Sequence, residues 1–441
     1  MEIQIISRDK VSPSTPTPDH LKSFKLSYLD QQATSNYVTI ILFYPPYSTD
    51  EDKNQVEHLK RSDQLKKSLS ETLTHFYPVA GRIVNGVTLD CNDKGVEFLE
   101  ARVKNTRLSD FLIRPNIDEL SKFLPCDPYV TTNEALCSNS LLAIQTTYFD
   151  CGGIALGFCF SHKIADGASM ATFINCWAST AINGSTESIP NLFFDLSSLF
   201  PAKDSNGLIA PSGVGMVDNI VTRRFVFDGK KIDALRGEII FNNSKKNSKE
   251  EYPTRVEAVS AFIWKHAIRA ARARAGPLRA SAALHAVNLR GRMVPASPNH
   301  RFGNASRPAI TEIVNLESET ESHALVKHLR DAIRGMDGDY VRKLQCGEEG
   351  FVKSFEEARK NFSKEELLVL NFNSWCRFPF YEADFGWGKP VWVSTTKTLG
   401  RNLIILIDTR CGGGIEAWLN MLEEDMDELE HDQEFLSFVS F

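Results

Sequence analysis

The segment 149–167 constrains the fold of this chain more than any other part of the sequence. An uncharged apolar run, 154–160, follows two glycines, and such a run is typical of a strand that is buried on both faces. His162 stands at the end of this strand, and Asp166 follows where the N-cap of a helix is expected. Large apolar residues at helical spacing predict that helix over 168–180. We therefore expect a rigid strand to hold the imidazole of His162 in one place.

His162 is the first candidate for chemistry, because imidazole is the side chain best suited to removing a proton near neutral pH. A histidine that merely packs in the core is the alternative. Asp166 can either orient His162, as the carboxylate of a catalytic triad does, or cap the helix and pair with an arginine. We favour the second interpretation. No third ligand lies nearby in the sequence, so we predict no metal site here.

A second candidate segment is 371–390. Asn373, Ser374 and Trp375 offer neutral hydrogen-bond donors, which suit a negative charge that develops on oxygen during a reaction. Plain core packing is the alternative for Trp375. Asp384 begins an Asp-Phe-Gly sequence, but the chain has neither the glycine-rich loop nor the His-Arg-Asp segment of protein kinases, which excludes that class.

A third candidate is a predicted helix start. Thr254 and Glu257 form the Thr-x-x-Glu pattern of a capping box, which predicts a helix that runs through Ala275. The free N–H groups at such a start can hold an anion. Basic residues further along the helix would add positive charge: Lys265, Arg269, Arg272 and Arg274. The alternative is that they only form a solvated face of the helix.

The bulk composition excludes several classes of protein. The chain has 441 residues and a formal net charge of −6, without the basic footprint of a nucleic-acid-binding protein. Its nine cysteines contain no Cys-x-x-Cys pair, so we expect reduced thiols and neither a zinc site nor a disulfide framework. No apolar run is long enough for a membrane span or a signal peptide. We therefore expect a cytosolic protein.

The domain organisation follows from a change of composition. Residues 201–219 are small, polar and rich in chain breakers, which indicates a linker between residues 1–200 and 220–441. Strands and helices alternate in both parts, which predicts an α/β or α+β fold with mixed sheets. More local predictions are strands at 37–44 and 141–149, a helix at 62–75, a hairpin of 87–89 with 95–103, and an amphipathic segment within 348–372.

Two motifs carry a resemblance to a known family. Residues 162–167 read His-x-x-x-Asp-Gly, and residues 384–388 read Asp-Phe-Gly-Trp-Gly. Both motifs, in this order and at this spacing, resemble the signatures of the BAHD acyltransferases of plants. The chain looks most similar to the branch of alkaloid acetyltransferases. The resemblance extends over nearly the whole chain, through 77–82, 150–153, 254–257, 288–290 and 303–304.

The resemblance implies a fold and two substrates. It implies two similar-sized domains of the chloramphenicol-acetyltransferase type with a solvent channel between them, and a segment around 371–395 that packs with the N-terminal domain. Acyl-CoA, with acetyl-CoA expected, would enter from one face and an alcohol from the other. No bound cofactor, nucleic acid or membrane is implied, and a monomer is expected.

The resemblance also implies roles for individual residues. His162 would deprotonate the acceptor hydroxyl, which attacks the thioester in a ternary complex without an acyl-enzyme. Asp166 would pair with Arg290 and shape the loop together with Gly167. Three residues would contact the oxyanion: Asn373, Ser374 and Trp375. Thr254 and Arg255 would contact CoA. Asp384 would have a structural role, and the alternative is that it acts as a second proton acceptor.

The predicted function is that of an acyl-CoA-dependent O-acyltransferase acting on a specialised metabolite such as an alkaloid or terpenoid. One alternative is a catalytically silent relative that binds ligands. The other is an amide-forming condensation domain, which usually carries a second histidine where this chain has Ser161. The sequence does not identify the acceptor alcohol.

Overall fold

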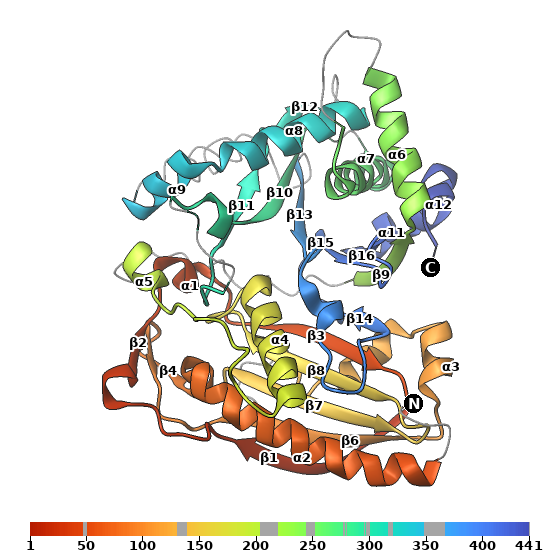
Figure 1. The fold of residues 1–441 in the computed structure, drawn as a ribbon. Helices are drawn as coiled ribbons and strands as arrows, with labels where there is room; N and C mark the ends of the chain where they lie inside the picture. Colours follow the sequence, from red (N-terminus) through yellow and green to blue (C-terminus); the bar gives the residue numbers. More distant parts are fainter. Residues whose placement is uncertain are drawn as a thin grey trace. The chain divides into compact units, whose positions relative to one another are not determined.

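The computed structural model describes residues 1–46, 51–129, 139–202, 219–243, 252–276, 278, 280–294, 296, 300–315, 321–347 and 367–440 (Figure 1). These residues divide into two compact units. Unit 1 comprises the described parts of 1–213, 298–305 and 378–397, and unit 2 comprises those of 214–297, 306–377 and 398–441. Unit 1 therefore contains two segments from the second half of the chain, and residues 371–377 belong to unit 2.

Unit 1 is built on a six-stranded mixed sheet in the order β1-β6-β7-β8-β3-β14. All eight residues of β8 are buried, as the apolar run predicts, and β8 pairs antiparallel with both β7 and β3. The pair β6·β7 is parallel. The strands are β1 (Glu2–Val11), β6 (Val96–Lys104), β7 (Leu142–Phe149), β8 (Ile154–Ser161), β3 (Tyr37–Tyr44) and β14 (Trp392–Ser394).

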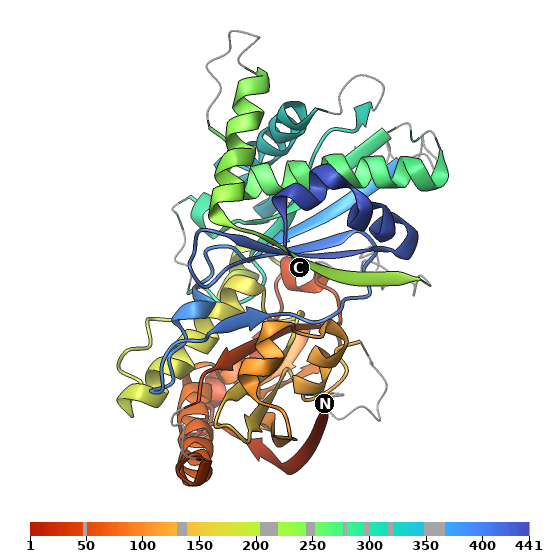
Figure 2. The ribbon, with the colours of Figure 1, turned by 90° about the vertical axis from the view of Figure 1, so that its right-hand side faces the viewer.

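Two long helices cover one face of this sheet, α2 (Glu51–His75) and α4 (Gly167–Asn183) (Figures 1 and 2). Trp177 of α4 is fully buried, packs edge-on against Phe158 of β8 and donates to Ser68 Oγ of α2 at 3.0 Å. One side chain thus joins the sheet and both helices. The helix α2 begins before residue 62, where the sequence predicted its start. Shorter helices of unit 1 are α1 (Tyr28–Gln32), α3 (Leu108–Ile113) and α5 (Leu196–Leu199).

The predicted hairpin of 87–89 with 95–103 is wrong. Strand β5 (Thr88–Asp90) lies in a small sheet between β2 (Ser23–Lys25) and β4 (Arg82–Val84), whereas β6 pairs with β1 and β7. The turn residues between β5 and β6 mark a change of direction, but a turn sequence does not determine which strand becomes the partner.

The expectation of reduced thiols throughout is also wrong, because Cys126 is disulfide-bonded. The other cysteines of the described residues are free. Cys-x-x-Cys pairs and regular cysteine spacings are the sequence signals of metal sites and disulfide frameworks, and one isolated bridge produces neither signal.

Unit 2 has a second mixed sheet in the order β11-β10-β13-β15-β16-β9, with β12 also paired to β10. The pairs β10·β13 and β13·β15 are parallel and the others antiparallel, so the predicted mixed sheets are confirmed in both units. The strands are β9 (Ile220–Phe227), β10 (Ala280–Asn288), β11 (Ser306–Ile310), β12 (Val314–Asn315), β13 (Leu367–Ser374), β15 (Leu403–Asp408) and β16 (Ile415–Leu422).

Helices gather on one side of this sheet and share a single apolar core with it (Figure 2). The central helix α7 follows the predicted capping box of Thr254 and Glu257 and ends at Gly276, whose φ is 81°. Its Trp264 donates to Ser281 Oγ of β10 at 2.7 Å. The helices in the described part of unit 2 are α6 (Gly229–Asn243), α7 (Arg255–Ala275), α8 (Ser322–Gly335), α9 (Gly338–Gln345), α11 (Glu423–His431) and α12 (Gln433–Phe438).

The predicted amphipathic segment within 348–372 has two different outcomes. Residues 348–366 lie outside the described residues. Residues from Leu367 onward belong to the strand β13. β13 lies between two parallel neighbours, and this pairing decides that the short apolar run forms a strand. Alternate side chains of the strand point into the core: Leu368, Leu370 and Phe372.

The described residues contain neither a membrane-spanning helix nor a cluster of metal ligands. Among them, no helix is long and apolar enough to cross a membrane. No group of three or more His, Cys, Asp or Glu side chains in the described part of the chain is arranged to hold a metal ion.

Gly157 in β8 allows the backbone at Phe123 to approach closely, which yields a first prediction. A Cβ at this position would lie 2.0 Å from the carbonyl oxygen of Phe123. We expect Gly157→Ala to lower the free energy of unfolding by about 3 kcal/mol, the upper part of the range for overpacked cores. Urea unfolding followed by circular dichroism measures the change.

The control is Gly237→Ala in helix α6, where an added Cβ meets no atom within 4 Å. This substitution should raise the free energy of unfolding by about 0.4–1 kcal/mol. Equal stabilities of the Gly157→Ala variant and the unsubstituted protein would contradict the close approach.

Candidate active site

His162 directly follows β8 and is fixed at its backbone. Its N–H donates to the carbonyl oxygen of Asn36 at 3.1 Å, and its own carbonyl oxygen accepts a hydrogen bond from Asn304 Nδ2 at 2.7 Å. The ring is held as well, since Nδ1 lies 3.1 Å from Asn304 Oδ1. All of these residues belong to unit 1. The strand end and Asn304 therefore determine where the imidazole lies.

The Asn304 amide also determines which ring nitrogen carries the proton. Asn304 Nδ2 donates to two acceptors, Asp30 Oδ1 at 2.9 Å and the His162 carbonyl oxygen. The amide oxygen must then be the atom that faces His162 Nδ1, because only a nitrogen can serve both of those acceptors. An amide oxygen cannot donate, so Nδ1 carries the proton. Nε2 is left with the lone pair, which is the form that a general base requires.

Asp30 fixes the Asn304 amide in turn. Its Oδ1 accepts from the Asn304 backbone N–H at 2.8 Å, in addition to the amide, and its Oδ2 accepts from Ser27 N at 2.9 Å and Ser27 Oγ at 2.6 Å. Only 2% of Asp30 is exposed. Burial raises the pKa of Asp30, and the hydrogen bonds from Ser27 and Asn304 oppose that rise. A line of buried groups thus runs from Ser27 through Asp30 and Asn304 to His162.

Sequence reasoning did not assign Asp30 or Asn304 to the site. Both left a signal. Ser27 and Asp30 form a capping box at the start of α1, and Asn304 belongs to a Gly-Asn pair within the family resemblance. Neither signal points to His162, however, because 142 residues separate His162 from Asn304.

Asp166 is the N-cap residue of α4 and does not bond to the His162 ring in the structure. Its Oδ1 accepts from Ser169 N at 3.0 Å, and its Oδ2 accepts from Ala305 N at 2.9 Å. Ser169 Oγ and Gly303 bond to each other twice. Asp166 thereby fastens the segment that carries Asn304 to the start of α4.

Gly167 fits closely against a neighbouring ring. A Cβ on Gly167 would lie 2.7 Å from Phe378 Cε2. The predicted ion pair of Asp166 with Arg290 joins residues of different units and stays a prediction. Within unit 2, Arg290 is fully buried, and its backbone N–H and Nη1 both donate to Asn288 Oδ1.

Asp384 closes a tight turn in unit 1. Its Oδ1 accepts from Gly386 N at 2.8 Å and from Gly388 N at 2.9 Å, and both glycines have positive φ, 100° and 98°. The buried Phe385 stacks on Trp387, and the Arg61 guanidinium lies 4.8 Å above the Trp387 ring. Both of these hydrogen bonds to the carboxylate therefore shape the turn.

The predicted oxyanion residues do not share one face of the sheet in unit 2. Successive side chains of a strand point to opposite faces. Phe372 is in the helix-covered core, so Ser374 lies on that side and Asn373 on the other. Trp375 follows β13, and its backbone N–H donates to Leu406 O at 2.7 Å. Asn373 and Ser374 therefore cannot both direct their side chains to one oxygen.

Cys376 is the thiol nearest to this segment. Its backbone N–H donates to Ser374 Oγ at 3.4 Å. Burial raises the pKa of Cys376 to about 12, so the thiol stays protonated at neutral pH. A protonated thiol is a poor nucleophile, which argues against an acyl-enzyme on this residue.

Thr254 and Arg255 are engaged within unit 2. Thr254 Oγ1 accepts from Glu257 N at 3.2 Å as the cap of α7. Arg255 Nη1 donates to the carbonyl oxygens of Gly412 and Gly414, and Nη2 lies 3.0 Å from Asp408 Oδ1. The Arg255 side chain is 25% exposed.

The known proteins that match this chain do so over nearly its whole length. A family model described as Transferase family matches residues 1–436. Stemmadenine O-acetyltransferase of Catharanthus roseus is 40% identical, over 99% of this chain and 98% of that protein. Limonoid 7-O-acetyltransferase of Citrus sinensis is 38% identical, over 100% and 98%. The crystal structure of vinorine synthase matches with a TM-score of 0.83 and 38% identity, over 100% of this chain and 99% of that one.

The tautomer of His162 yields a second prediction. Asn304→Leu removes the amide oxygen, so the proton should no longer be confined to Nδ1. We expect the ¹⁵N chemical shifts of the His162 ring at neutral pH to move toward those of a tautomer mixture. Protein labelled with ¹⁵N-histidine gives the measurement, and His162→Gln assigns the signal.

His266 is the internal control. Its Nδ1 bonds to Asp432 Oδ2 at 2.7 Å within unit 2, so its signals should not change. Unchanged His162 shifts in folded Asn304→Leu protein would show that the amide does not set the tautomer.

Proposed function

The chain belongs to the Transferase family, the BAHD acyltransferases, and from this premise we propose that it moves an acetyl group from acetyl-CoA to a hydroxyl of a small metabolite. His162 is the proposed base. The observation that carries this proposal is the hydrogen-bonded amide of Asn304, which leaves the lone pair of the imidazole on Nε2.

The proposed reaction needs one base and no covalent intermediate. His162 Nε2 takes the proton of the acceptor hydroxyl as the oxygen attacks the thioester carbonyl carbon. The resulting imidazolium keeps its Nδ1–H bonded to Asn304 Oδ1, and the buried carboxylate of Asp30 lies behind the amide. The tetrahedral intermediate then expels the CoA thiolate, and the thiolate receives the proton from Nε2.

The developing oxyanion needs neutral donors. We assign this role to Asn373 and Trp375, because Ser374 lies on the helix-covered side of the sheet in unit 2. For CoA we propose the start of α7, where Thr254 holds the first turn in place and Arg255 is partly exposed. A helix start with an arginine attracts phosphate groups.

The acceptor class follows from the relatives. Stemmadenine and a limonoid are named as substrates of two of them. We propose an alkaloid or terpenoid alcohol for this chain as well, and a cytosolic monomer as the working form.

A screen of acceptors and acyl donors tests the proposal and yields a third prediction. Purified protein is incubated with acetyl-CoA and a panel of alkaloid and terpenoid alcohols, and mass spectrometry detects free CoA and the acetylated product. His162→Ala should lower kcat by about 10²–10⁴-fold, the usual contribution of one general base.

His20→Ala, at an exposed histidine, is the matched control and should keep full activity. Binding of CoA without turnover of any acceptor would instead support a silent ligand-binding protein. Normal turnover by His162→Ala would exclude His162 as the base.

Asp384 yields a fourth prediction, because its two hydrogen bonds both end on Oδ1. The amide oxygen of Asn can accept the same two bonds, so Asp384→Asn should keep kcat within about twofold if the carboxylate only shapes the turn. Asp384→Ala loses both bonds and should lower the thermal midpoint of unfolding. A large fall of kcat in well-folded Asp384→Asn protein would instead show that the charge takes part in catalysis.

A further inference from the structure

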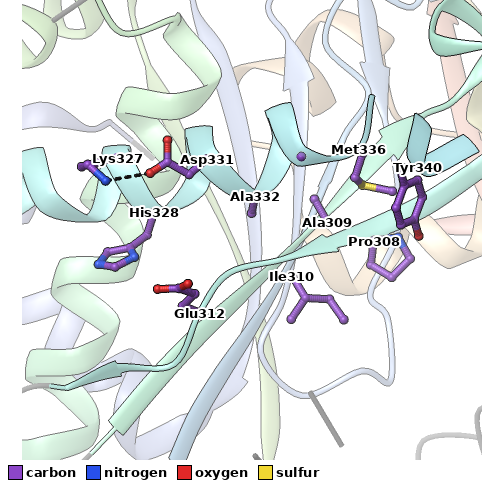
Figure 3. Close-up of a pocket in the computed structure, with 11 residues that line it drawn as sticks. Pro308, Ala309, Ile310, Glu312, Lys327, His328, Asp331, Ala332, Met336 and Tyr340 are labelled. Atoms are coloured by element: carbon purple, nitrogen blue, oxygen red, sulfur yellow. Dashed lines mark hydrogen bonds and ion pairs between the residues drawn. The ribbon is translucent and has the colours of Figure 1, made fainter. Parts of the chain in front are cut away.

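Unit 2 contains a pocket of about 340 Å³ between helix α8 and the edge strand β11 (Figure 3). None of the residues that line it is among those proposed for acetyl transfer. The volume lies at the small end of the range for ligand sites, about 300–1,000 Å³. The floor is formed by Pro308 and Ile310 of β11. On α8, Ala332 and Gly335 leave the space open, and a Cβ added at Gly335 would meet no atom within 4 Å.

The walls of the pocket are held by bonds that do not involve a ligand. Arg292 donates to the carbonyl oxygens of Ile333 and Met336 and so caps the end of α8. Asp337 Oδ1 accepts from the N–H groups of Asp339 and Tyr340 and fixes the start of α9. These bonds fix the two helix ends that form the apolar end of the pocket.

The two ends of the pocket differ in chemistry. Met336 and Tyr340 form an apolar, aromatic end together with Pro308, whereas Glu312 and Asp331 lie at the other end (Figure 3). A thioether and an aromatic ring favour contact with an aromatic or aliphatic group.

The charges at the polar end are not balanced. Asp331 pairs with Lys327 at 2.8 Å. Glu312 is exposed and has no ion-pair partner among the residues that the structure describes. In Figure 3 its carboxylate lies on the same side of the pocket as His328. Two carboxylates and one lysine give this end an excess negative formal charge, which a cationic ligand would neutralise.

We propose that this pocket is a second, non-catalytic ligand site for small amines with an aromatic or aliphatic body. The ammonium group lies at Glu312, and the apolar body lies against Met336 and Tyr340. The assignment rests on the pocket, the unpaired carboxylate and the apolar end, and it does not depend on the acetyl transfer proposed above.

The methyl group of Met336 reports directly on this site. The chain has seven methionines, so protein labelled with ¹³C-methyl-methionine gives a simple spectrum, and Met336→Leu assigns the signal. The probe is 2-phenylethylamine at pH 7, where an alkylamine is protonated. We expect a saturable shift of the Met336 signal with this probe, and weaker binding of the uncharged 2-phenylethanol and of the anionic 3-phenylpropionate.

Two variants locate the site. Gly335→Leu fills the pocket and should abolish the shift, while Gly237→Leu on the exposed face of α6 is the matched control and should leave binding unchanged. Glu312→Gln should weaken binding of 2-phenylethylamine by about two- to fivefold, the effect expected of one exposed ion pair. His162→Ala should bind like the unsubstituted protein.

Three results would overturn the proposal. The first is a Met336 signal that does not move with 2-phenylethylamine. The second is equal binding of all three probes, which would exclude selection by charge. The third is an equal shift of the Met426 signal, since Met426 lies in the buried core of unit 2 and should not sense this pocket.

Discussion

The candidate site depends on the burial of one carboxylate. Removing a charged group from water costs several kcal/mol in a protein, so Asp30 has to be compensated where it lies. Four donors do this, two from Ser27 and two from Asn304, and hydrogen bonds to a charged group are worth about 1.5–3 kcal/mol each. Their combined contribution can offset the penalty only if Asn304 keeps one orientation. That orientation determines the tautomer of His162.

An amide between the carboxylate and the ring has a chemical consequence. A carboxylate in direct contact with an imidazole favours the charged ring and raises its pKa. Asn304 contacts the ring through a neutral group and confines the ring proton to Nδ1, so the lone pair of Nε2 faces away from this contact. The same contact still orients the imidazolium that forms when the proton arrives. Asp166 takes no part in this line, because both its oxygens serve backbone N–H groups.

Local signals in the sequence predicted the parts of the fold that local forces decide. The apolar run gave β8, and the caps at Asp166 and Thr254 gave the starts of α4 and α7. Pairing between distant segments was not predictable in this way. The turn residues after β5 gave no information on the partner of β6, and β13 became a strand because of its parallel neighbours. The site shows the same limit, because His162 was evident from its strand, whereas Asp30 and Asn304 reach it only in the folded chain.

The Asp-Phe-Gly-Trp-Gly motif illustrates how a family signature can have a structural cause. The chain passes from unit 2 to unit 1 between Arg377 and Phe378. Arg377 has a φ of 69°, and its N–H donates to Asp408 Oδ2 at 2.6 Å, so the residue just before this crossing is itself tied to β15. The segment that follows needs its own anchors in unit 1. The buried Phe385 provides one, and the pairing of β14 with β3 provides another. This turn needs a carboxylate, two glycines with positive φ and two aromatic rings. Few other sequences meet all of these requirements, so the motif can be specific for the family without contributing a catalytic group.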